Sequence, residues 1–117
     1  MPSYILNSGG SGSVIDPKQS FNVASSATVN QYLDTVASFG SARLLVEILD
    51  TTDNRRSFQI MVATKKQDGS IEDQVFGIAG DTINFTADIT INASNVVLSV
   101  TNNDTNLLQI SFIKTLI

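Results

Sequence analysis

The sequence predicts an all-β fold, namely an antiparallel β-sandwich of the jelly-roll kind with seven or eight strands and an extended N-terminal arm. Apolar and polar residues alternate in strand-length runs from Val29 to Ile117, which is typical of strands with one buried face. Clusters of Asn, Asp, Gly and Thr break these runs at intervals of about 8–14 residues, as in sandwiches. No run with helical period is long enough to cross a parallel sheet.

The chain of 117 residues has the length of one domain. Residues 1–20 differ in character from the rest, because a Ser- and Gly-rich stretch over residues 8–13 separates two short apolar patches. These patches are Tyr4, Ile5 and Leu6 before the stretch, and Val14 and Ile15 after it. We expect residues 1–20 to form an arm, which adds an edge strand to its own sheet or reaches onto a partner, and residues 21–117 to form the sandwich.

The first part of the sandwich contains two short strand-like segments, 20–24 and 29–33. Residues 31–39 would also suit a helical turn or two, so that alternative stays open. The clearest strand is 42–49, which carries leucine on both faces and is therefore expected at the centre of a sheet.

The next two strands form a predicted hairpin. Residues 57–65 alternate, and we expect the side of Phe58, Ile60 and Val62 to face the core and the side of Met61 to face outward. Asp68-Gly69 then separates this run from a returning strand at 71–78, and Asp-Gly favours a tight two-residue turn.

Three more strands complete the fold, at residues 82–90, 95–101 and 107–117. Their alternation predicts these inward side chains: Ile83, Phe85, Ala87 and Ile89 in the first, Val96, Leu98 and Val100 in the second, and Leu108, Ile110, Phe112 and Leu116 in the third.

Some apolar residues lie opposite these main stripes. Each of two packed sheets has a single inner face, so apolar side chains on the other faces need a cover from elsewhere. We therefore expect a homo-oligomer, a dimer or trimer, and contacts with other proteins. The expected partner-binding residues are Leu45, Leu49, Met61 and Val97 on the sandwich, with Tyr4, Ile5, Leu6, Val14 and Ile15 on the arm.

The composition argues against an enzyme. The chain contains no His and no Cys, which removes the usual general base and every thiolate nucleophile or ligand. We expect no cofactor and no metal. Loop clusters around Asp50 and Asp104 carry oxygen ligands, but neither follows a calcium-binding loop, and ordinary turn chemistry is the favoured interpretation.

The charge argues against nucleic acid as a partner. The formal net charge is -4, whereas phosphate binding depends on clustered cations. The pairs Arg55-Arg56 and Lys65-Lys66 are expected to be solvated strand ends. No run approaches the ~18 apolar residues of a membrane helix, so we expect no membrane contact.

Four segments carry a resemblance to a known family. Residues 41–48 read Ser-Ala-Arg-Leu-Leu-Val-Glu-Ile and run into Asp-Thr-Thr-Asp-Asn at 50–54. Later come Phe-Thr-Ala-Asp-Ile at 85–89, Asn-Val-Val-Leu-Ser-Val-Thr at 95–101 and the ending Phe-Ile-Lys-Thr-Leu-Ile. From about Val29 onward the chain resembles a β-module of tailed-bacteriophage virion structural proteins.

The resemblance implies a structural role in a virion assembled in the host cytoplasm. A capsid decoration or cement protein that binds the major capsid protein, or other virion proteins, is the first expectation. The alternative is a fibre, neck or tail-tip module that recognises a host glycan. The family carries no catalytic residues over to this chain.

Overall fold

The computed structural model describes residues 14, 15 and 17–117, and these form nine β-strands and no helix. The strands are β1 (Val14–Ile15), β2 (Gln19–Val23), β3 (Thr28–Thr35), β4 (Ser41–Asp50), β5 (Arg55–Lys65), β6 (Ile71–Gly80), β7 (Phe85–Asn92), β8 (Asn95–Asn102) and β9 (Leu108–Leu116). Within this described part there is also no helix that could span a membrane.

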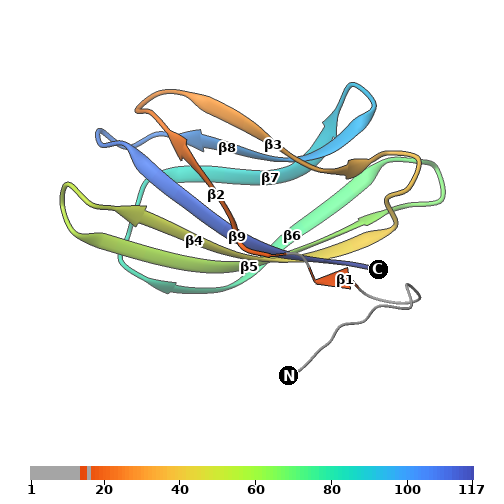
Figure 1. Cartoon of the computed structure of the whole chain (residues 1–117), viewed down its shortest axis with the longest axis horizontal. Helices are drawn as coiled ribbons and strands as arrows, with labels where there is room; N and C mark the ends of the chain where they lie inside the picture. The colour runs from red at the N-terminus through yellow and green to blue at the C-terminus, as the bar shows by residue number, and fades with distance from the viewer. Residues whose placement is uncertain (1–13, 16) are drawn as a thin grey trace.

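The strands form two layers (Figure 1), and every pair of neighbours is antiparallel. Sheet A has the order β1-β9-β4-β5-β6, and β2 also pairs with β9, while sheet B has the order β3-β8-β7. The pairing is nested, since β2 pairs with β9 and β3 with β8. The predicted all-β sandwich of jelly-roll kind is confirmed.

The core lies between the two sheets and consists of alternate side chains. In β4 the side chains of Leu44, Val46 and Ile48 are fully buried. β4 lies between β9 and β5, which confirms the central position predicted from leucine on both faces. The inward sets predicted for 82–90, 95–101 and 107–117 also face the core.

The predicted hairpin between β5 and β6 is present, with a longer turn than expected. Lys66 and Ser70 close the turn through a backbone hydrogen bond of 2.8 Å, and Gly69 has a φ of +91°. Only Gly69 takes positive φ in this loop, because a three-residue loop needs one left-handed residue, whereas a type I′ two-residue turn needs two. The helical alternative for residues 31–39 is wrong, since most of that segment belongs to β3.

The two faces of β5 are exchanged relative to the prediction. Met61 is fully buried in the core, whereas Ile60 and its alternate neighbours Phe58 and Val62 are only half-buried on the outer face of sheet A. The reason is the register with β4, which pairs Met61 with the buried Leu44. Paired residues on neighbouring strands point to the same face of the sheet, so the partner of a buried β4 residue is also directed into the core.

Candidate docking surface

A row of four apolar side chains crosses the outer face of sheet A. Ile113 on β9 is paired with Leu45 on β4, Leu45 with Ile60 on β5, and Ile60 with Phe76 on β6. We call these four residues the apolar row. Phe76 remains 51% exposed, and the other three are half-buried. The row spans three strand spacings, about 14 Å, so one continuous apolar band faces away from the core.

The surroundings of the apolar row combine further apolar groups with charges at the margin. A hollow of about 280 Å³ lies beside the row, and its lining includes the apolar residues Leu45, Ile113 and Phe58 and the charged residues Glu47 and Lys18. The carboxylate of Glu47 also lies 3.5 Å from the guanidinium of Arg56, at an exposed position. An apolar centre with a charged rim is the usual anatomy of a protein–protein contact.

Two of the four predicted partner-binding residues on the sandwich belong to this face. Leu45 is part of the apolar row, and Leu49 lies on the same outer face, paired with Arg56. The prediction that Met61 and Val97 lie on the surface is wrong, because their exposed fractions are 0% and 4%. Met61 faces the core for the reason given above.

Val97 is buried although it lies on the strand face opposite Val96 and Leu98. It occupies the middle strand of sheet B, with Tyr32 of β3 and Thr90 of β7 paired on either side. The side chains of flanking strands can cover a small residue in a central strand, and the sequence does not show that cover.

The predicted arm residues fall in two groups. Val14 and Ile15 form β1, whose backbone pairs with Leu116 and Thr115 of β9. This part of the arm therefore adds an edge strand to its own sheet, one of the two expected arrangements. Tyr4, Ile5 and Leu6 lie outside the described residues.

Three residues of the apolar row were missed by the sequence reasoning: Ile60, Phe76 and Ile113. Ile60 was assigned to the core because it belongs to the more apolar side of β5. No local signal opposed that assignment, because the side of β5 that is buried carries the polar residues Ser57 and Gln59 as well as Met61 and Ala63. Ile60 is paired with Leu45 on one side and with Phe76 on the other, so the apolar row continues across β5 to β6.

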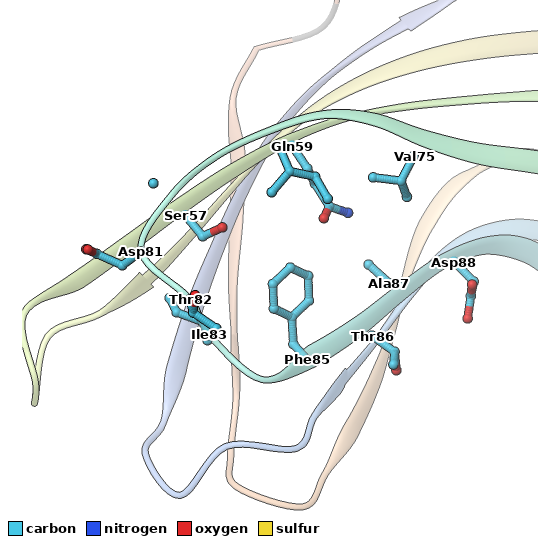
Figure 2. Close-up of a pocket in the computed structure, with 12 residues that line it drawn as sticks. Ser57, Gln59, Val75, Asp81, Thr82, Ile83, Phe85, Thr86, Ala87 and Asp88 are labelled. Carbon is cyan, nitrogen blue, oxygen red and sulfur yellow. The ribbon is translucent and has the colours of Figure 1, made fainter.

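A second hollow lies at one edge of the sandwich, between the edge strands β6 and β7 (Figure 2). We call it the β6/β7 groove. Its volume is about 470 Å³, and its lining includes Val75 and Ile78 of β6, Phe85 and Ala87 of β7, and Gln59 of β5. Figure 2 shows the Gln59 amide directed into the space between the sheets, above the Phe85 ring.

The acidic loop residues form an ion-pair cluster at one end of the sandwich. The Arg55 guanidinium donates hydrogen bonds to Asp50 Oδ2 at 2.6 Å and to Asp104 Oδ1 at 2.9 Å. Asn106 donates to Asp50 at 3.0 Å, and Asp50 is fully buried. Arg55 therefore links the β4–β5 turn to the β8–β9 loop and is not the solvated strand end predicted for it.

These contacts change the ionisation of the cluster. Hydrogen bonds from Arg55 and from the Asn84 backbone hold the pKa of Asp104 well below its ordinary value. The pKa of Asp50 is lowered mainly by the hydrogen bond from Asn106, with Arg55 adding to the effect. In the described residues no group of three or more acidic side chains is arranged to hold a metal ion. The cluster is a structural clamp.

No protein-family model matches this chain, and no curated protein matches its sequence.

Proposed function

We propose that this chain is a non-enzymatic structural protein of a phage virion, of the capsid decoration or cement kind. It binds the shell through the outer face of sheet A and neighbouring subunits through its arm and sandwich. The observation that carries the proposal is the apolar row, which crosses four strands and ends at the half-exposed Phe76. A band of this kind on a small domain marks an interaction surface.

The size of the apolar row favours a repeated contact. A stable pairwise interface buries about 800 Å² on each partner, and a band about 14 Å wide supplies only part of that. Several copies bound to a repeating lattice gain affinity from simultaneous attachment. A protein shell, built from the major capsid protein or other virion proteins, is such a lattice.

The composition supports the same role. Charged residues make up only 15% of the chain, against about 25% in ordinary soluble domains. Weak charge repulsion suits a subunit that packs closely beside copies of itself. We therefore propose that the protein acts in the virion as a small oligomer, without nucleic acid or membrane as a partner.

Glycan recognition by a fibre, neck or tail-tip module is the less supported function. Sugar binding usually employs an aromatic platform beside polar groups. Among the described residues, the exposed aromatic side chains are Tyr32 and Phe76, and they lie on different sheets, so they do not form a shared platform. Saturable binding on a glycan array would place this function first.

Co-sedimentation of the purified protein with virions tests the proposal. Leu45→Glu places a carboxylate in the centre of the apolar row, and we expect at least a tenfold loss of affinity, equivalent to about 1.4 kcal/mol. Asn30→Glu is the matched control, because Asn30 is exposed on β3 in the other sheet. Equal binding by both variants, or no binding by the unaltered protein, would overturn the proposal.

A further inference from the structure

The β6/β7 groove separates two strands that each have no neighbour on that side among residues 14, 15 and 17–117. β6 is the last strand of sheet A, and β7 is the last strand of sheet B. Val75 and Ile78 on the β6 side are 39% and 71% exposed, although both line the groove. The sandwich is therefore open at this edge, and its apolar lining continues to the surface.

Two buried polar side chains point into the groove. Ser57 and Gln59 are 4% and 5% exposed, and Figure 2 shows both directed from β5 toward the space beside Phe85. Neither side chain forms a hydrogen bond with another described residue. Buried polar groups are nearly always hydrogen-bonded. An amide without a partner at the base of an open groove therefore indicates a ligand that binds it.

The backbone of β7 adds unused hydrogen-bonding groups. The Ile89 N–H points away from β8, because it donates to the Asp73 carboxylate at 3.0 Å. In an antiparallel pair, alternate residues direct their backbone groups to the same side. The N–H and C=O groups of Phe85 and Ala87 therefore also point away from β8, toward the open edge.

Together these features match an extended peptide. An edge strand offers backbone pairing, apolar walls accept alternate side chains, and strand addition uses both. The Gln59 amide carries one acceptor and two donors, so it can bind the C=O and N–H of a peptide group. The groove thus fits a short apolar segment in extended conformation.

The chain contains one such segment outside the described residues, Tyr4-Ile5-Leu6. Residues 1–13 include no charged side chain. The segment is therefore not repelled by Asp81 and Asp88, which lie at the margin of the groove. It is also joined to β1 by a Ser- and Gly-rich stretch, which allows it to reach away from its own sheet.

The position of β1 favours a groove on a second copy. β1 and β6 occupy opposite ends of sheet A, four strand spacings or about 19 Å apart. The groove also lies about four residues further along the strands, so a path around β6 measures about 30 Å. For a Gly/Ser-rich linker of the length of residues 7–13, the mean span is about 15 Å. The segment Tyr4-Ile5-Leu6 can therefore reach the groove of its own chain only if the linker is almost fully extended. The groove of a neighbouring copy does not require this extension.

We propose that Tyr4-Ile5-Leu6 of one copy adds a strand to β7 of a second copy, within the β6/β7 groove, and that Gln59 binds its backbone. This inference rests on the proposed function, in which the arm engages a neighbouring subunit. It specifies the receiving edge and the residue that recognises the arm.

Disulfide trapping tests the proposal directly, because the chain has no native cysteine. Protein carrying Ile5→Cys is mixed with protein carrying Ala87→Cys and oxidised. The matched control replaces Ala87→Cys by Ala27→Cys, because Ala27 is also half-buried and precedes β3 at the opposite edge of sheet B. We expect a cross-linked heterodimer with Ala87→Cys at least tenfold more abundant than with Ala27→Cys. Equal yields, or none, would overturn the proposal.

A doubly substituted chain, with Ile5→Cys and Ala87→Cys together, distinguishes binding of the arm within one chain from binding between two chains. If dilute protein forms the disulfide within a single chain, the arm occupies its own groove and the proposal is wrong. Formation only between chains supports it.

Gln59→Leu tests the recognising residue. We expect a fold at least as heat-resistant as the unaltered protein, since an unpartnered amide is removed, and a cross-linking yield at least tenfold lower. Gln109→Leu, at an exposed site on β9, is the control and should leave the yield unchanged. An unchanged yield for Gln59→Leu would show that the amide binds water only, and would overturn its assigned role.

The outcomes separate this inference from the proposed function. Leu45→Glu lies on the outer face of sheet A, so it should weaken virion binding at least tenfold and leave the cross-link intact. If the unaltered protein does not bind virions but the cysteine variants still form the cross-link, the virion role alone is refuted. Virion binding without the cross-link would refute the strand addition alone.

Discussion

Replacement of Met61 by alanine tests the assignment of the two faces of β5. Met61 is fully buried and paired with Leu44, so Met61→Ala removes the side chain from a closed position. Such truncations destabilise proteins by about 2–5 kcal/mol. Phe76→Ala is the comparison, because Phe76 is 51% exposed on the outer face and leaves no cavity. We expect its cost to be below about 1 kcal/mol.

The expected shift in melting temperature follows from the size of the chain. At about 2.1 cal/mol/K per residue, the entropy of unfolding is about 0.25 kcal/mol/K, so a loss of 3 kcal/mol lowers the melting temperature by about 12 °C. Thermal unfolding followed by circular dichroism measures both variants. A shift below about 4 °C for Met61→Ala, with a larger shift for Phe76→Ala, would refute the face assignment.

Three further predictions concern stability. The pKa of Asp104 is depressed in the folded state, so its contribution is complete above its unfolded pKa of about 3.9 and is lost as the pH falls below it; Asp104→Asn should lower stability at pH 7 and flatten the acid limb of a urea-midpoint profile, and an unchanged profile would contradict the clamp. Lys114 is 6% exposed and donates a hydrogen bond to the Leu33 carbonyl, so Lys114→Ala should cost about 2 kcal/mol in chemical unfolding, whereas a neutral result would show that this contact adds no stability. A Cβ at Gly80 would lie 2.4 Å from a backbone carbonyl oxygen, whereas a Cβ at Gly69 would meet nothing within 4 Å; Gly80→Ala should therefore destabilise the protein more than Gly69→Ala, and the reverse order would show that the β6 end is placed wrongly.

Strand existence followed from the sequence because alternation and turn residues agree along most of the chain. β7 shows this well, since its inward and outward residues were assigned correctly from period two alone. The centre of sheet A also followed, because leucine on both faces of β4 requires neighbours on both sides. Such local patterns need no knowledge of pairing.

Which face of β5 is buried did not follow, because alternation shows that two faces differ and not which one meets the core. The more apolar side, with Ile60, lies outside, and the side that carries Ser57 and Gln59 lies inside. Register between strands decides this, and register depends on contacts distant in sequence. The conclusion that surplus apolar groups face outward holds, but most of the residues that form the surplus are different ones.

The buried polar groups were also beyond sequence reasoning. Arg55 and the cluster around Asp50 were assigned to solvent and to ordinary turns, because the partners that bury them come from other loops. Lys114 reaches across the core to the Leu33 carbonyl of β3, a contact that the sequence analysis did not anticipate. A long side chain inside a strand gives no sign of a carbonyl acceptor in the facing sheet.

Hydroxyl-radical footprinting of the assembled particle tests the central claim most directly, because two aromatic residues serve as matched reporters. Phe76 and Tyr32 are 51% and 48% exposed in the free protein, the first on sheet A and the second on sheet B. Docking through the apolar row predicts that oxidation of Phe76 falls sharply on the virion while oxidation of Tyr32 stays near its free value. Equal oxidation of Phe76 in the free and bound states, or protection of Tyr32 instead, would contradict it.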